Sequence, residues 1–172
     1  MTTTEVMLSF VGQKEIPPNM GFVDKAFEAM MRSVGWVPRW AWCALLVKLG
    51  LKKSGATPNL VLPGAVRTYR AYEKAGRTTK VPVSGCIGAY ALYKNGKPHP
   101  DGLGHLVWVT AYAPGSDAFA TVEGNTESDE RNADGTRDGD MCALKKRRLT
   151  FDIPKGGNGL RLLGFCIVDE AA

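Results

Sequence analysis

The stretch HLVWVTAYAPGSDAFATVEGN, residues 105–125, contains two runs of β-branched and aromatic residues joined by the turn sequence APGSD. Such a pattern predicts a β-hairpin. A turn centred on Gly115 places His105 opposite Asn125. Because side chains alternate along a strand, His105, Glu123 and Asn125 then lie on one face, with Glu123 diagonal to the histidine and within reach of its side chain. A register slip of one residue would separate these polar side chains.

Apolar residues before the hairpin recur at helical spacing. This pattern predicts three helices, which cover residues 22–35, 40–50 and 65–75. The second of them, WAWCALLVKLG, is almost wholly apolar. Lys48 in its last turn and Gly50 as its C-cap indicate where it ends.

The second half of the chain is rich in β-forming residues. Besides the hairpin, strands are predicted at residues 85–93, GCIGAYALY, and 160–169, LRLLGFCIVD, and a basic strand, KKRRL, at residues 145–149. Helices followed by strands, rather than alternating with them, indicate an α+β fold with N-terminal helices packed on a C-terminal antiparallel β-sheet. With 172 residues, of which 44% are hydrophobic, we expect one domain over residues 1–172.

The net charge of +5 favours an anionic partner, which includes nucleic acid, a membrane surface and the acidic polymers of a bacterial envelope. In a strand the charges of KKRR, residues 145–148, alternate between two faces, so we expect no specific nucleic-acid partner. The apolar run at residues 41–47 is too short to cross a bilayer. The N-terminal residues lack the pattern of a secretory signal. We therefore expect a soluble protein that is made in a cytoplasm and not exported by the general pathway; we also expect a monomer.

Four cysteines are scattered along the chain without a CxxC pair, which indicates neither a zinc site nor a disulfide framework. Cys43 falls in the first turn of the second predicted helix. The helix dipole there favours a thiolate, and the backbone N–H of Cys43 can stabilise an oxyanion. The alternative is that Cys43 is a small buried residue, the role we expect for Cys86, Cys142 and Cys166.

A Cys–His hydrolase needs a histidine that accepts the thiol proton on one ring nitrogen while a carboxylate or amide orients the other. The predicted hairpin supplies His105 for the first role, and Glu123 and Asn125 for the second. From the pattern alone, an ordinary histidine–acid pair on a sheet is the more frequent arrangement.

Three pieces of sequence together resemble one family. Trp42-Cys43-Ala44 opens an apolar helix, Gly104-His105 opens a strand, and TVEGNT ends the next strand. In this order they resemble the CHAP family of cysteine, histidine-dependent amidohydrolases and peptidases, which belongs to the papain-like peptidoglycan hydrolases. The resemblance covers residues 21–149.

The resemblance implies a papain-like fold without a cofactor. It also implies that Cys43 is the nucleophile, His105 the base, Glu123 the orienting group and Asn125 a supporting member. Where the family commonly has a Gly-Asp pair before the histidine strand, this chain has Ser84-Gly85-Cys86.

Metal binding is not expected. Asp24 is the only aspartate in the segment where some CHAP members bind calcium, and the loop sequence NADGTRDGD, residues 132–140, lacks alternate-position ligands and a closing glutamate. The polar stretch 126–140 that contains it is predicted to be an exposed loop. Trp40, Trp42 and Trp108 are candidate walls of a substrate cleft, with core packing as the alternative.

The function expected from the resemblance is hydrolysis of a peptidoglycan amide, by an N-acetylmuramoyl-L-alanine amidase or a stem-peptide or cross-bridge endopeptidase. The setting that we expect is a phage endolysin that reaches the cell wall with the help of a holin. A secreted antibacterial effector, a non-catalytic basic binding or structural protein on the same fold, and a nucleic-acid binder are the alternatives.

Overall fold

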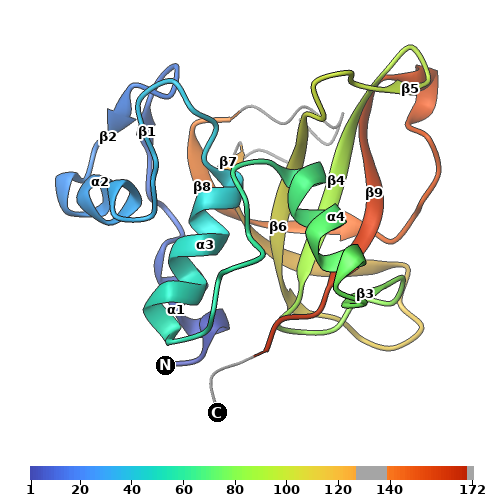
Figure 1. Cartoon of the computed structure of the whole chain (residues 1–172), viewed down its shortest axis with the longest axis horizontal. Helices are drawn as coiled ribbons and strands as arrows, with labels where there is room; N and C mark the ends of the chain where they lie inside the picture. Colours follow the sequence, from blue (N-terminus) through green and yellow to red (C-terminus); the bar gives the residue numbers. More distant parts are fainter. Residues whose placement is uncertain (127–138, 170–172) are drawn as a thin grey trace.

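A computed structural model describes residues 1–126 and 139–169. Within them, helices and a sheet form two sides of the molecule (Figure 1). The helical segments are α1 (Thr3–Ser9), α2 (Lys25–Arg32), α3 (Cys43–Ser54), α4 (Ala65–Lys74) and the 3₁₀ turn η2 (Lys155–Gly157). The strands are β1 (Glu15–Ile16), β2 (Gly21–Phe22), β3 (Thr78–Thr79), β4 (Ile87–Lys94), β5 (Lys97–Pro98), β6 (Gly104–Ala111), β7 (Ala118–Thr126), β8 (Met141–Arg148) and β9 (Gly159–Cys166).

The main sheet is antiparallel, and its strands follow the order β3-β9-β4-β6-β7-β8, with β5 paired to β4. Helices precede it in the chain: α3 packs on β6 and β7, and α4 packs on β4 and β9. The predicted α+β class with an antiparallel sheet is therefore confirmed.

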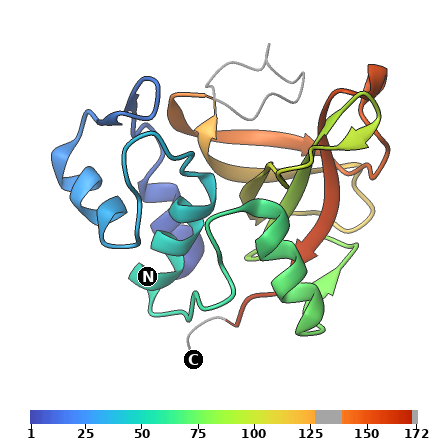
Figure 2. The same ribbon diagram turned by 45° about the horizontal axis from the view of Figure 1, so that its top comes forward.

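The sheet curls strongly, which Figure 2 shows in the path of β7 and β8. Phe119 on β7 and Phe165 on β9 have ring centroids 5.2 Å apart although β4 and β6 lie between their strands in the sheet. Likewise the guanidinium of Arg147 on β8 lies 5.7 Å from the ring centroid of Tyr90 on β4. Such contacts require strands that are distant in the sheet to face each other across its concave side.

Two apolar clusters follow from this shape. The larger one fills the space between the helices and the convex face of the sheet, and it includes Leu46 on α3, Leu106 on β6 and Val122 on β7. The smaller one lies on the concave side and includes Val107 and Phe119. Alternation along β6 and β7 thus sends neighbouring residues into different clusters.

Helix α3 starts within the predicted segment but ends later than expected. It continues through Gly50 to Ser54, and the C-cap is Gly55, whose φ of 85° is left-handed. Gly50 lies inside the helix, where α1 packs against it. A glycine is needed there because a Cβ on Gly50 would overlap the Met7 side chain of α1. The glycine therefore serves helix packing, and the predicted C-cap at Gly50 was wrong.

The sequence analysis missed α1. Its signal is the start TTTE, because the Thr2 hydroxyl accepts a hydrogen bond from the Glu5 backbone N–H at 3.2 Å, and the Glu5 carboxylate accepts from the Thr2 N–H at 2.8 Å. This reciprocal arrangement is a capping box. No helix among the described residues is both long and apolar enough to span a membrane.

Candidate active site

Cys43 is the first residue of α3, as the sequence predicted. Trp42 precedes it as the N-cap and has no side-chain oxygen with which to cap the helix. The thiol therefore lies at the positive end of a 12-residue helix dipole. Cys43 is buried, with 7% of its surface exposed.

The hairpin has the predicted register at its centre. Trp108 pairs with Val122 and Val109 with Thr121, and a bulge follows before Ala111. The regular ladder ends at Trp108 and does not include His105 and Asn125. Beyond it the side chains make the connection: His105 Nε2 lies 2.9 Å from Glu123 Oε2.

The ionisation of Glu123 decides which nitrogen of His105 carries hydrogen. An ionised carboxylate only accepts, so Nε2–H of His105 donates to Glu123. The other ring nitrogen, Nδ1, is buried without a nitrogen or oxygen partner among the described residues. Cys43 also hydrogen bonds to His105, and with Nε2 occupied, Nδ1 is the atom available to the thiol.

The charge of the imidazole follows from these neighbours. Burial lowers the pKa of His105, but hydrogen bonding and attraction to Cys43 and Glu123 outweigh burial and raise the pKa from 6.5 to about 9. The attraction is mutual, so the protonated ring favours the Cys43 thiolate. The arrangement therefore supports a thiolate–imidazolium pair, which is the reactive state of a Cys–His hydrolase.

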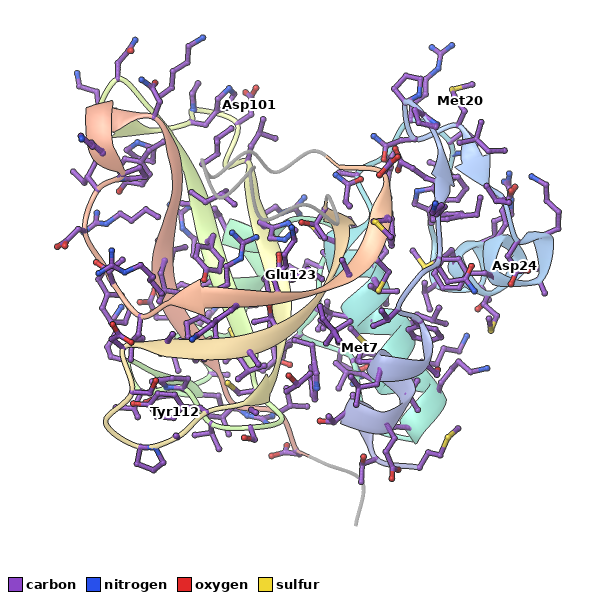
Figure 3. All side chains as sticks on the ribbon, turned by 180° about the vertical axis from the view of Figure 1, so that it is seen from behind. Met7, Met20, Asp24, Asp101, Tyr112 and Glu123 are labelled. Carbon is purple, nitrogen blue, oxygen red and sulfur yellow. The ribbon has the colours of Figure 1, made fainter. Side chains whose placement is uncertain are left out.

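Glu123 is fully buried, and Figure 3 shows it near the middle of the molecule, whereas Asp24 and Asp101 lie at the periphery. Its Oε1 accepts from the Thr121 hydroxyl at 2.6 Å and from Arg147 Nε at 2.8 Å, and its Oε2 accepts from Arg147 Nη2 at 2.5 Å. Burial raises the pKa of Glu123, but the charge and hydrogen bonds of Arg147 and His105 hold it well below its ordinary value.

Sequence reasoning assigned no role at the site to Arg147 or Thr121. The KKRR strand shows the predicted alternation: Lys146 and Arg148 are exposed, while Lys145 and Arg147 are partly buried. That alternation was the available signal for Arg147. The identity of the carboxylate that Arg147 contacts depends on the pairing of β7 with β8, which the alternation does not show.

Asn125 is buried near the end of β7, with a left-handed φ of 55°. The pairing of β7 with β8 shifts register between Glu123 and Thr126, so Asn125 lies in an irregular part of the strand. Its carbonyl accepts from the Gly139 N–H at 3.1 Å. The structure thus places Asn125 two residues from Glu123, in the irregular end of β7.

The three tryptophans proposed as substrate contacts have different environments. Trp42 and Trp108 are fully buried in the larger cluster, where the indole of Trp42 donates to Glu15 Oε2 at 2.6 Å and that of Trp108 to the Thr4 hydroxyl at 3.0 Å. Both are core residues in this structure. Trp40 is 47% exposed, and we retain it alone as a candidate substrate contact.

Two glycines allow the helices to approach the sheet beside the site. A Cβ on Gly124 would lie 2.6 Å from the Trp42 ring and 2.8 Å from the Leu46 side chain. A Cβ on Gly104 would lie 3.2 Å from the Cβ of Ala65 at the start of α4, and it would also overlap the backbone carbonyl of Tyr90 on β4. Each glycine neighbours a site residue in sequence, and each faces the opposite side of its strand.

Gly124→Ala is expected to destabilise the fold by about 1–3 kcal/mol, because the added methyl group must displace the Trp42 ring from the first turn of α3. Chemical unfolding monitored by tryptophan fluorescence measures this loss. Gly115→Ala is the control that measures backbone strain alone. A Cβ on Gly115 would have no neighbour within 4 Å, but the residue has a left-handed φ of 84°. A Gly124→Ala variant as stable as wild type would show that α3 does not depend on this close approach.

The other cysteines have the predicted buried positions, with 2% of Cys86 and none of Cys142 or Cys166 exposed. Burial raises the pKa of Cys86 to about 11 and the pKa values of Cys142 and Cys166 to about 12. None of the four cysteines, all in the described part of the chain, forms a disulfide. Cys43 is therefore the cysteine placed for reaction.

Within residues 1–126 and 139–169, no group of three or more His, Cys, Asp or Glu side chains is arranged to hold a metal ion. Asn132, Asp134 and Asp138 of the polar loop lie outside the described residues. Comparisons of the chain with protein-family models, with curated proteins and with solved structures find no match.

Proposed function

We propose that this protein is a cysteine amidohydrolase that cleaves an amide bond of bacterial peptidoglycan. The observation that carries the proposal is the buried chain of contacts from Cys43 through His105 to Glu123. A thiol at a helix N-terminus, an imidazole with a raised pKa and an ionised carboxylate are the parts that acyl transfer by a cysteine requires.

In the proposed mechanism the Cys43 thiolate attacks the carbonyl carbon of the amide, and the backbone N–H groups in the first turn of α3 stabilise the oxyanion. A C–S bond forms, the C–N bond breaks, and the His105 imidazolium gives its proton to the leaving amine. Neutral His105 then takes a proton from water, which attacks the thioester and releases the acid. Glu123 remains an anion throughout and holds the ring in orientation.

A papain-like arrangement is part of this proposal. Its support is the position of the nucleophile at the start of a helix that packs on the strands carrying the histidine and the carboxylate. The substrate class is supported by the CHAP-like motifs and by the net charge of +5, which attracts anionic wall polymers. We propose a phage endolysin as the biological setting.

Purified peptidoglycan digested with the protein, followed by mass spectrometry of the soluble fragments, tests the function. Fragments with a new amine and a new carboxylic acid would identify the amide that is cut. The matched control is protein pre-treated with iodoacetamide, which should release none of them. Equal fragment profiles with and without active protein would refute peptidoglycan hydrolysis.

The pH dependence of kcat/KM is expected to have an alkaline limb near pH 9. The pKa of His105 is raised to about 9, so the ring keeps the proton that the leaving amine needs up to that pH and loses it above. Because the pKa of His105 is higher in the fold than in the unfolded chain, protonation of the ring also stabilises the fold. This contribution is complete below pH about 6.5 and disappears as pH rises through 9. His99→Gln, at the other histidine, should leave the limb in place, and a limb near pH 6.5 would contradict the assignment.

A further inference from the structure

Glu123 is shared between two cations. Arg147 contacts both of its oxygens, through Nε to Oε1 at 2.8 Å and Nη2 to Oε2 at 2.5 Å. Oε2 also accepts from His105 Nε2 at 2.9 Å. The guanidinium therefore fixes the plane of the carboxylate, because two parallel contacts leave it no rotation. Glu123 Oε2, which accepts from the imidazole of His105, therefore also accepts from Arg147.

We propose that Arg147 is a positioning residue that holds Glu123 ionised and in the orientation that directs His105 towards Cys43. The proposal rests on the proposed function, since it gives Arg147 a role in the same Cys–His chemistry. Arg147 acts through Glu123 and touches no reacting atom.

Arg147 is itself held in place. Its strand, β8, lies three steps from β4 in the sheet, yet its guanidinium stacks 5.7 Å from the Tyr90 ring centroid across the concave side. Tyr90 pairs directly with His105 in the β4–β6 ladder. The side chain of Arg147 is 16% exposed, in contrast to Arg148, which points outward. Four strands thus contribute one side chain each to a single polar group: Tyr90, His105, Glu123 and Arg147.

The electrostatics explain why a permanent cation is needed. Among the described residues, the titratable or charged groups that influence Glu123 or its histidine include His105 on β6, Arg147 and Cys142 on β8, Tyr90 on β4 and Cys43 on α3. Of these, His105 loses its charge during the proposed reaction. A buried carboxylate without an adjacent cation tends to take up a proton. Arg147, which stays charged at all relevant pH values, keeps Glu123 an acceptor while His105 is neutral.

The test is the pH dependence of the rate at which iodoacetamide alkylates Cys43, followed by peptide mass spectrometry so that the other cysteines are scored separately. In Arg147→Met the acid limb of this profile is expected to move up by at least about one pH unit, because Glu123 protonates more readily and no longer supports the imidazolium. Arg147→Lys keeps the charge without the two-point contact, and a smaller shift in the same direction is expected. Arg148→Met, at the next residue of β8, should coincide with wild type.

Coinciding acid limbs in wild type and both Arg147 variants would overturn the proposal. If Arg147→Met does not fold, which circular dichroism would show, Arg147→Lys decides, and an unshifted limb in that variant overturns it. A purely structural role would lower the unfolding temperature without moving the limb. Digestion of peptidoglycan by wild type is scored separately: a shifted alkylation profile in a protein that releases no fragments would refute the proposed function and leave the role of Arg147 standing.

Discussion

Cys43→Ser is expected to hydrolyse peptidoglycan at least about 10⁴-fold more slowly than wild type, with the fold unchanged. Serine replaces sulfur by oxygen at the start of α3 and removes the group that forms the thiolate. Its hydroxyl ionises far above the pH range in which His105 is protonated, so no nucleophile–imidazolium pair forms. The residual rate would come from substrate binding and from backbone N–H groups that remain in place.

The same variant should change the titration of His105. Hydrogen bonding and attraction to Cys43, together with those to Glu123, raise the pKa of His105 to about 9 in wild type. Without the thiolate, the pKa of His105 is expected to fall, which NMR of the imidazole protons measures. Cys86→Ala is the matched control, because Cys86 is a buried thiol whose pKa is raised to about 11 and which is not among the groups that shift the pKa of His105. Full activity in Cys43→Ser would refute Cys43 as nucleophile.

Glu123→Gln is expected to reduce both activity and stability. The amide keeps the shape of the side chain but not its charge, so the imidazolium loses its anionic partner and either ring tautomer becomes possible. A loss of about 10⁴-fold in kcat is the scale for such a change next to a catalytic histidine. Arg147 also loses its anionic partner, and only 16% of its side chain is exposed to water that could replace the carboxylate. Breaking a buried ion pair by removing one partner costs about 3–5 kcal/mol of folding free energy.

The pH dependence of unfolding identifies the origin of that loss. The pKa of Glu123 is lower in the fold than in the unfolded chain, so the ionised carboxylate stabilises the fold fully above its ordinary pKa of 4.5 and progressively less as pH falls below it. Urea unfolding should therefore show the largest gap between wild type and Glu123→Gln near pH 7 and a narrower gap at pH 4. Glu73→Gln, on the exposed face of α4, is the control. A gap that does not change with pH would rule out charge as the cause.

The hairpin at residues 105–125 was predictable because its information is local. The APGSD turn marks the centre of the hairpin, and alternation along its strands then predicts His105 and Glu123 on one face. The bulge before Ala111 and the register shift after Glu123 were not predictable, because no residue pattern marks them. The second of them, between Glu123 and Thr126, lies where the regular β6–β7 ladder has already ended before Asn125.

The remaining parts of the site depend on tertiary contacts. Trp42 is next to Cys43 in sequence, and its spacing alone does not distinguish a substrate wall from a core residue. The partner that decides its position, Glu15, is 27 residues away and belongs to a two-residue strand. Arg147 on β8 contacts Glu123 on β7, and the sequence does not show in which register these two strands pair. The roles of Gly104 and Gly124 appear only where two layers meet.

The proposed nucleophile and its histidine belong to different layers of the fold: Cys43 begins a helix, and His105 lies at the start of a strand of the curled sheet. The Cys43 thiol and the His105 imidazole come together only when α3 packs on β6 and β7. In the nascent or denatured chain Cys43 is therefore an ordinary thiol, with no more reactivity than a free cysteine. In the proposed mechanism, folding is therefore the step that turns an ordinary thiol into a reactive one.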